Sequence, residues 1–262
     1  MEKYLLESPC YNECIIYDFD SCSGGLGDNI KFFMFLLETC MRTKKRLLYK
    51  KNNTEVEKFL PLNYPEMYVD EMEMQTLTNA EIIAPVSLYG SVNFQYSIPI
   101  SEVFRFSDEV KLNCKTLFPS DITNYISIHL RLGDKHLETD KRFVVCVDDA
   151  REFSEQNLKT CIENHMNENI FFCCDNHHFK MDMKNKYNRI IVTNGEIGHT
   201  GLANTTTKQV LDTVTEFFIL TNSKHIFSGS FSGFSVIASK FHNIPLTNLY
   251  SVLPHFIQGS NL

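Results

Sequence analysis

The sequence predicts an α/β fold with parallel strands. Near the amino terminus, a strand-like run, a glycine turn, an apolar helix and a second strand follow one another, as in a βαβ unit. In the middle of the chain, residues 125–130 form another apolar strand-like run, which ends in a polar loop. With 262 residues, the chain can form one large domain or two small ones.

The amino-terminal unit contains a candidate anion-binding turn. Its expected elements are a strand over residues 13–19, a helix over residues 30–40 and a strand over residues 46–49. Gly25 and Gly27 precede the helix, so the backbone can turn tightly and free N–H groups at the helix start can meet an anion. A plain strand–helix turn would also use glycine, so the turn alone does not establish binding.

The region between this unit and the centre of the chain is poorly patterned. Prolines at four positions divide residues 51–100 into short apolar pieces, for which we expect short helices and loops. Residues 101–118 carry apolar side chains at helical spacing and predict one helix that crosses toward the second half. The domain boundary is expected near residues 118–121.

The central strand is followed by residues suited to bind phosphate. His129, Arg131 and Asp134 lie at or near its carboxyl end, where open α/β sheets bind ligands. Arg131 is a permanent planar cation that can contact a phosphate through two nitrogens. An Arg–Asp pair that closes a turn explains the same residues equally well. On this stretch alone both interpretations stay open.

The second half alternates helices and strands. The expected elements are a helix over residues 154–163, a strand over 169–176 that contains Asp175, a strand over 189–193, a loop over 195–207, a helix over 209–222, a strand over 225–227 and a helix that ends near residue 238. Before the last helix, Ser230, Ser232 and Gly233 can offer hydroxyl and N–H groups to a diphosphate. A helix cap with a flexible turn is the alternative.

Several of these motifs resemble one enzyme group. His-x-Arg-x-Gly-Asp at residues 129–134 resembles the first motif of the GT-B-fold fucosyltransferase superfamily, which includes α1,2-, α1,6- and protein O-fucosyltransferases. The apolar run ending at Asp175 is similar to the second motif, and Asp212 with the following helix, strand and serine-rich loop is similar to the third. The turn at residues 25–29 resembles the amino-terminal glycine loop imperfectly, because Asp28 stands before Asn29.

The resemblance implies a fold and a function for each half of the chain. It implies a GT-B-like architecture of two Rossmann-like halves that face a cleft. Residues 1–118 would form the acceptor-side half, and residues 119–262 would bind the nucleotide-sugar. The donor would be GDP-fucose or a related nucleotide-sugar, the acceptor a glycan or protein hydroxyl, and no metal or other cofactor would be needed.

The resemblance also suggests roles for individual residues. Arg131 would neutralise the leaving phosphate, with Lys135 as a second charge. The other expected substrate-binding residues are Gly25, Gly27, Asn29, His129, Asp175, Asp212, Ser230, Ser232 and Gly233. Inverting transfer needs a general base, for which Glu138 is the first candidate. Its spacing differs by one residue from the α1,6 pattern, so Asp28 and Asp140 remain alternatives. Asp134 would order the loop.

Other interpretations remain. Asp18-Phe19-Asp20 could chelate Mg²⁺ or Mn²⁺ beside phosphates, but the motif is short and lies on the first strand, so the metal-free reading is preferred. The transferred sugar could be another deoxysugar such as rhamnose. A non-catalytic nucleotide- or glycan-binding module on the same scaffold is the alternative outside enzymes. The remaining histidines at positions 136, 177, 178 and 199 are expected on the surface or in loops.

Composition narrows the class of protein. The net charge of −7 and the absence of a basic stripe argue against nucleic-acid binding. The nine cysteines are odd in number and several lie in apolar runs, which predicts reduced thiols in the cytoplasm. No apolar run approaches the ~20 residues of a membrane span, so no membrane-spanning segment is expected.

Overall fold

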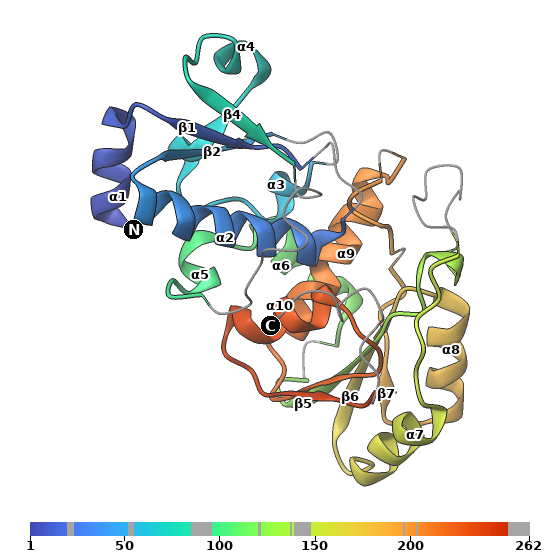
Figure 1. Cartoon of the computed structure of the whole chain (residues 1–262). Helices are drawn as coiled ribbons and strands as arrows, with labels where there is room; N and C mark the ends of the chain where they lie inside the picture. Colours follow the sequence, from blue (N-terminus) through green and yellow to red (C-terminus); the bar gives the residue numbers. More distant parts are fainter. Residues whose placement is uncertain are drawn as a thin grey trace.

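The computed structural model describes residues 1–19, 24–51, 55–84, 96–119, 122–136, 138, 148–195, 197–202 and 204–250. Its strands form two separate sheets, in which every neighbouring pair is parallel. The predicted α/β class with two Rossmann-like sheets is thereby confirmed (Figure 1).

All strands before residue 118 lie in one sheet and all strands after it in the other. The amino-terminal sheet has the order β3-β2-β1-β4, with β1 (Cys14–Tyr17), β2 (Arg46–Lys50), β3 (Tyr68–Val69) and β4 (Ala80–Ile83). The carboxyl-terminal sheet has the order β7-β6-β5-β8-β9, with β5 (Tyr125–Leu130), β6 (Asn169–Cys174), β7 (Ile190–Ile191), β8 (Ile226–Ser228) and β9 (Leu246–Asn248).

The described helices lie before or between the parallel strands. They are α1 (Glu2–Glu7), α2 (Leu26–Thr43), α3 (Val56–Phe59), α4 (Glu71–Met74), α5 (Ile100–Val103), α6 (Asp108–Leu117), α7 (Glu155–Asn164), α8 (His177–Lys186), α9 (Thr207–Leu220) and α10 (Gly233–Phe241). Side-chain caps define several of their starts: Ser107 caps α6, Ser154 caps α7, Asn176 caps α8 and Thr206 caps α9. Within the described residues, no helix is long and apolar enough to cross a bilayer.

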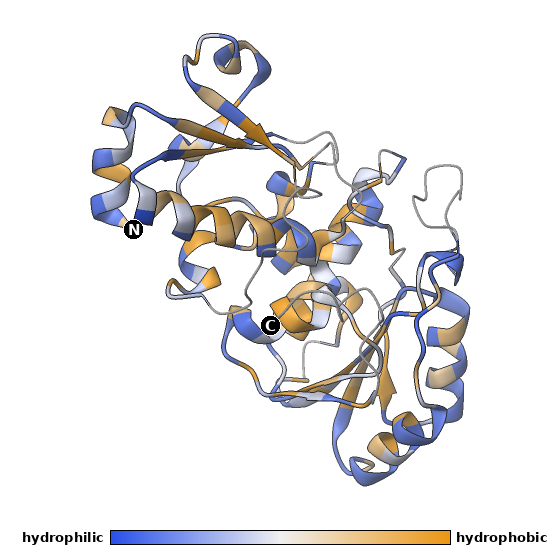
Figure 2. Cartoon of the chain, viewed as in Figure 1, coloured by the Kyte–Doolittle hydropathy of each residue, from blue (hydrophilic) through white to orange (hydrophobic). Residues whose placement is uncertain are grey.

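The central strands are buried on both faces. All residues of β5 are buried, as are five consecutive residues of β6. Helices on each side of a parallel sheet exclude water from both faces, so such strands carry continuous apolar runs rather than alternating ones. The five buried residues of β6 form such a run, whereas β5 alternates Ile126, Ile128 and Leu130 with buried Ser127 and His129. Orange stretches are visible along the lower sheet in Figure 2. Residues 125–130 were recognisable as a strand from their β-branched, aromatic and aliphatic residues rather than from an unbroken apolar run.

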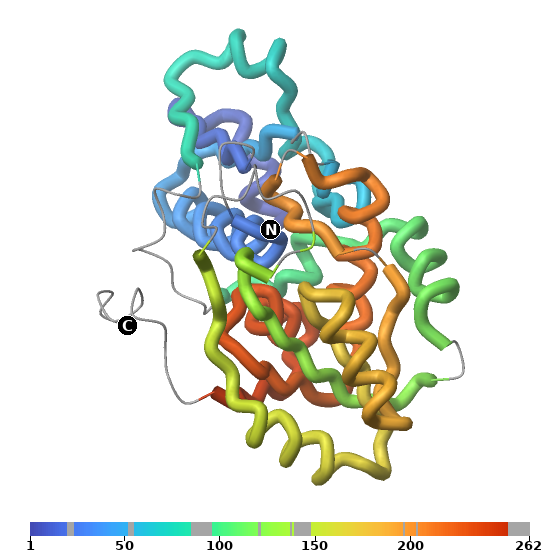
Figure 3. The backbone as a smooth tube through the Cα atoms, turned by 90° about the vertical axis from the view of Figure 1, so that its right-hand side faces the viewer, coloured from blue at the N-terminus to red at the C-terminus, as the bar shows by residue number. Residues whose placement is uncertain are grey.

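Helix α2 is buried on more than one face because it lies between the two halves. One side covers the amino-terminal sheet and another contacts α10 of the second half. Figure 1 shows α2 between the upper strands and α10, and Figure 3 shows blue α2 above red α10 from the side. A helix that packs against one surface needs only one apolar stripe, whereas this position requires several.

One hydrophobic core crosses the sequence boundary between the halves. Phe106 precedes residue 118, yet its ring centroid lies 4.9 Å from those of Phe218 and Phe241, which follow it. Buried residues from both halves, including Phe33 and Phe217, belong to the same apolar cluster. The two halves are therefore joined through side-chain packing, and the predicted cleft between them stays a prediction.

Two expectations for residues 51–118 were wrong in detail. The region expected to hold only short helices and loops also contains β3 and β4. Both are short edge strands, and Ile82 on β4 is 57% exposed, so neither produces a clear alternation. The single helix expected over residues 101–118 is divided into α5 and α6, because Ser107 accepts a hydrogen bond from Val110 N–H and starts a new helix there.

Candidate functional site

The candidate site lies at the switch point of the carboxyl-terminal sheet. From β5 the chain proceeds to β6 and β7 on one side, and β8 and β9 lie on the other side. The carboxyl ends of β5 and β8 therefore flank the position where strand order reverses, which is where open α/β sheets bind ligands. The loop with Arg131 follows β5, and the serine-rich loop before α10 follows β8.

Hydrogen bonds hold these two loops together. Arg131 N–H donates to Ser230 Oγ at 2.9 Å, and the Ser230 hydroxyl donates to the Arg131 carbonyl at 2.7 Å. Gly229 N–H donates to the carbonyl of His129 at 2.8 Å. Ser232 caps α10 by accepting a hydrogen bond from Phe234 N–H at 3.3 Å. Ser230 thus acts on the backbone of the neighbouring loop, whereas Ser232 and Gly233 form the start of α10.

Asp175 supports the loop after β5 from the adjacent strand. Its carboxylate accepts hydrogen bonds from Leu132 N–H at 2.7 Å and from Gly133 N–H at 3.1 Å. Gly133 has φ of +101°, and a Cβ there would collide with the Asp149 carbonyl, so the tight turn requires glycine. Burial raises the pKa of Asp175, although the Arg131 charge opposes it. In this structure Asp175 positions the turn; its contact with a base or ribose stays a prediction.

The guanidinium of Arg131 lies among carboxylates. It forms an ion pair with Asp134, and its Nη2 is 3.9 Å from Asp149. Asp149 also pairs with Arg151 at 2.9 Å. The Arg131 side chain is 21% exposed, and both of its ion pairs within the described residues use Nη2. The pair that closes the turn therefore exists, and it leaves the planar group partly accessible for a second partner.

The starts of two helices meet beside this loop. Helix α2 begins at Leu26 with Gly25 as its cap, and a Cβ on Gly27 would lie 2.6 Å from the carbonyl carbon of Gly233 in α10. Only glycine at position 27 permits this approach. Helix starts carry unpaired N–H groups and a partial positive charge, so two adjacent starts favour an anion. The structure thus brings Gly25, Gly27 and Gly233 together.

Asp28 lies at the same junction. In the first turn of α2, its carboxylate pairs with Lys31 at 2.6 Å. A Cβ on Gly233 would lie 3.7 Å from Asp28 Oδ1, so the carboxylate is next to the start of α10. Of the candidates for a general base, Asp28 is placed between the two halves. Asp140 lies outside the described residues.

His199 was not selected from the sequence but lies in this site. It is in a loop, as expected, and it is buried rather than on the surface, with 9% of it exposed. Its Nδ1 is 3.3 Å from Gly201 N–H, and its Nε2 is 3.6 Å from where a Cβ on Gly25 would be. Burial lowers the pKa of His199 to about 4, and the charge of Arg131 contributes. The sequence signal for a role of His199 was its position in the glycine- and threonine-rich loop over residues 195–207.

His129 lies beneath the site, inside the carboxyl-terminal half. Its ring stacks on Phe234 with centroids 5.2 Å apart, and it is only 4% exposed. Burial, with the nearby Arg131 charge, lowers the pKa of His129 to about 3, so the ring is neutral. Its Nδ1 has no hydrogen-bond partner among the described residues. Contact with a diphosphate or ribose stays a prediction.

Two other predicted site residues, Asn29 and Asp212, face elsewhere in the described structure. Asn29 turns into the amino-terminal half and donates to the Tyr49 hydroxyl at 2.8 Å. Asp212 is fully buried and accepts hydrogen bonds from Asn113 at 3.0 Å and from Lys208 at 2.6 Å. Lys135 follows Asp134, and its N–H donates to the Asp149 carbonyl at 3.0 Å.

Glu138 lies at the start of α8. Its carboxylate accepts hydrogen bonds from the N–H groups of His177 and His178, each at 3.2 Å, and contacts His178 Nδ1 at 2.6 Å. Burial disfavours its charged form, but the hydrogen bonds from His178 and His177 outweigh burial and lower the pKa of Glu138. A lowered pKa weakens a general base.

The acidic motif on the first strand is only partly described. Asp18 pairs with Lys50 at 3.1 Å, at the carboxyl ends of β1 and β2. Asp20 lies outside the described residues. Among the residues that the structure does describe, no group of three or more His, Cys, Asp or Glu side chains is arranged to hold a metal ion.

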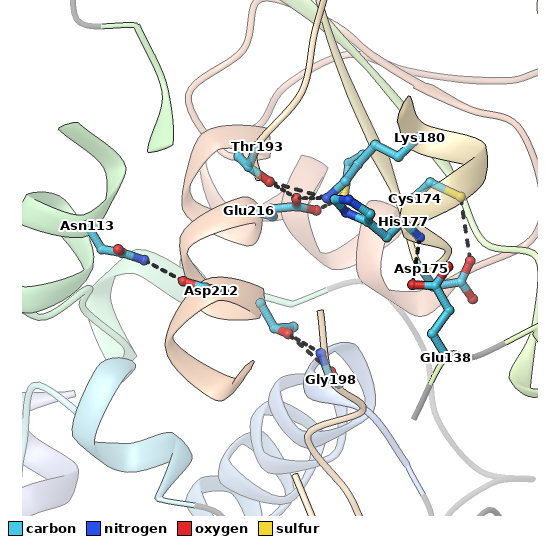
Figure 4. A network of polar contacts seen from close by, with 12 residues as sticks. Asn113, Glu138, Cys174, Asp175, His177, Lys180, Thr193, Gly198, Asp212 and Glu216 are labelled. Atoms are coloured by element: carbon cyan, nitrogen blue, oxygen red, sulfur yellow. Dashed lines mark hydrogen bonds and ion pairs between the residues drawn. The ribbon is translucent and has the colours of Figure 1, made fainter. Parts of the chain in front are cut away.

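A buried polar network lies behind the site (Figure 4). Lys180 on α8 pairs with Glu216 on α9 at 2.7 Å, and neither side chain is more than 1% exposed. The Thr193 hydroxyl also hydrogen-bonds Glu216, and the Cys173 thiol donates to it at 2.9 Å. The network thus ties α8, α9, β6 and the segment that follows β7 to one another.

Comparisons with solved structures show the same fold. The α1,6-fucosyltransferase NodZ co-crystallised with GDP superposes with a TM-score of 0.56 at 9% identity, over 86% of this chain and 91% of that one. NodZ soaked with GDP-fucose gives 0.55 at 9% identity over 87% and 92%, and a further crystal structure names Bradyrhizobium as its source. POFUT1 in its apo form gives 0.53 at 12% identity over 90% and 97%. No protein-family model and no curated protein matches the sequence. The GT-B fucosyltransferase-like fold is therefore confirmed.

Proposed function

We propose that this protein is a glycosyltransferase that transfers fucose from GDP-fucose to a hydroxyl of a glycan or protein. One observation carries the proposal: Arg131 lies at the switch point of the second sheet, next to the start of α10. This combination of a permanent cation and free helix N–H groups suits a nucleoside diphosphate. The shared fold with NodZ, crystallised with GDP and with GDP-fucose, supports the choice of donor.

In this proposal the residues around Arg131 stabilise the leaving group. As the sugar–phosphate bond breaks, negative charge grows on the diphosphate, and a fixed guanidinium stabilises that charge most in the transition state. The first turn of α10 adds backbone N–H donors at Gly233, and Ser230 keeps the loop with Arg131 in place. These groups supply charge stabilisation without a metal ion, so we propose metal-independent, inverting transfer. The free thiols of the seven described cysteines fit the proposed cytoplasmic location.

The first prediction concerns the nucleotide. GDP at about 100 times its dissociation constant should stabilise the fold by about 2.7 kcal/mol, whereas UDP and dTDP should shift the melting temperature less. Thermal-shift titrations with the three nucleotides measure this directly. A repeat with EDTA should give the same GDP shift. A larger shift with dTDP would favour another deoxysugar donor such as rhamnose, and loss of the GDP shift with EDTA would contradict metal-independent binding.

The second prediction concerns the general base. We favour Asp28 over Glu138, because Asp28 lies at the junction of the halves and Glu138 is engaged at the start of α8. Asp28→Asn should lower turnover by about a hundredfold, the lower end of what a general base contributes. Steady-state kinetics of Asp28→Asn and Glu138→Gln, on samples with equal melting temperatures, compare the candidates. A greater loss in Glu138→Gln would assign the base to Glu138. Wild-type GDP binding with no detectable transfer would instead favour the non-catalytic module.

A further inference from the structure

The loop that carries His199 is fixed against the start of α2. The Cα of Gly201 lies so close to the carbonyl oxygen of Gly24 that no side chain fits between them. On the other side, Gly198 exchanges two hydrogen bonds of 3.1 Å with the Thr213 hydroxyl of α9. The carbonyl of His199 accepts a hydrogen bond of 2.6 Å from Thr205. The backbone at His199 is thus held between α9 of the second half and the glycine turn of the first.

These contacts orient the imidazole ring. Nδ1 is placed to accept a hydrogen bond from Gly201 N–H at 3.3 Å, so the neutral ring carries its proton on Nε2. Nε2 is directed toward Gly25, the cap of α2, where the missing side chain leaves room. The hydrogen bond found for this ring within the described part of the chain uses Nδ1, and Nε2 is not among the fully buried polar atoms that lack a partner. Nε2–H is therefore accessible at the glycine turn, where it can donate to a ligand.

The charged groups around the ring define what that ligand can be. Arg131 lowers the pKa of His199 from the loop after β5, and the carboxylates of Asp28 in α2, of Asp134 and of Asp149 act in the opposite direction. Because the pKa of His199 is lowered to about 4 by burial and by Arg131, the ring is neutral at physiological pH. It therefore offers one N–H next to the start of α2, within the electrostatic influence of the Arg131 cation. An anionic oxygen that meets all three would be stabilised by each of them.

We propose that His199 is a binding residue whose Nε2–H donates a hydrogen bond to a phosphate oxygen of the nucleoside diphosphate. The inference rests on the proposed function, because the diphosphate is taken to be that of the sugar donor. It also assigns a role to the close packing of Gly201 on Gly24, which fixes the distance between His199 and the start of α2. The ligand would then be held by groups from both halves.

Two substitutions separate the nitrogen atoms of the ring. The amide nitrogen of glutamine reaches the position of Nε2, whereas that of asparagine reaches the position of Nδ1. His199→Asn should therefore weaken GDP binding about tenfold or more, the effect expected for losing one hydrogen bond to a charged group. His199→Gln should retain most of the affinity. Isothermal titration calorimetry with GDP measures both, with melting temperatures recorded on the same samples.

Guanosine and pH provide readouts that a purely structural role would not change. Guanosine lacks the diphosphate, so its affinity, measured by competition, should be the same in the wild type and in His199→Asn. The ratio of wild-type to His199→Asn affinity for GDP should stay constant between about pH 6 and 8, because the ring is neutral over that range.

The outcomes distinguish the inference from the proposed function. Wild-type binding of GDP that His199→Asn does not weaken would overturn the inference alone. The same holds if both substitutions weaken GDP equally, or if guanosine is weakened as much as GDP. If the wild type binds no nucleoside diphosphate at all, the proposed function fails as well.

Discussion

Replacing Arg131 by alanine should lower the turnover of sugar transfer by about 10²–10³, the loss typical of removing one preorganised donor from a developing negative charge. Arg131 lies at the switch point of the second sheet with its side chain 21% exposed, and its backbone is hydrogen-bonded to Ser230 in the loop before α10. Arg131→Lys should recover only part of the rate, because an ammonium cannot contact a phosphate through two planar nitrogens. Steady-state kinetics on samples of known folded fraction measure the effect.

Asp134→Asn is the matched control for this prediction. Arg131 pairs with Asp134, so the alanine change removes both a possible phosphate contact and an ion pair that closes the turn. Asp134→Asn removes the ion pair and keeps the guanidinium. If Arg131 serves the phosphate, Asp134→Asn should retain most of the turnover. Equal losses of turnover in both variants, accompanied by equal drops in melting temperature, would show that Arg131 has a structural role only.

Lys180→Met should lower the free energy of unfolding by about 3–5 kcal/mol, the usual effect of leaving one buried charge without its partner. Glu216 is 1% exposed, and its remaining hydrogen-bond partners among the described residues, Thr193 and Cys173, are neutral. Burial disfavours the charged form of Lys180, but the attraction of Glu216 outweighs it and raises the pKa of the ammonium, so Lys180 is charged in the wild type. Urea denaturation monitored by circular dichroism measures the change.

The double variant Lys180→Met/Glu216→Gln tests whether the charge left behind causes the effect. With both charges removed, most of the lost stability should return, because buried ion pairs contribute little beyond a neutral replacement. A double variant as unstable as Lys180→Met would show that packing around Lys180, rather than the charge on Glu216, determines the loss.

Local patterns were sufficient to predict the fold and part of the site. The strand before Arg131 was predictable because β5 is buried on both faces, and the loop after β8 because a strand, serines and a helix start follow in order. Both loops follow the carboxyl ends of parallel strands. Because these ends lie at the same edge of the sheet, the sequence alone indicates where the two loops are. Arg131, Ser232 and Gly233 were therefore placed together by reasoning from single segments.

Contacts between distant segments could not be predicted in this way. Asn29 follows the glycine turn as a binding residue would, but the helical rotation at its position directs it to Tyr49 in the core. Asp212 occupies the expected place of the third motif along the chain. Its carboxylate nevertheless accepts a hydrogen bond from Asn113 of another helix. His199 joins the site only because its loop packs on Gly24, a contact without any sequence signal.

The shared core has a consequence for the catalytic cycle. Many two-domain enzymes exchange substrates by swinging their domains about a hinge, on microsecond-to-millisecond timescales. Here an opening motion would have to separate Phe106 from Phe218 and Phe241. Exposing each such ring costs about 1.5–3 kcal/mol, so wide hinge opening would be rarely populated. Substrate entry and product release would then depend on movements of loops and side chains, while the two halves keep their relative position. The distance from the start of α2 to Arg131 would stay the same throughout turnover.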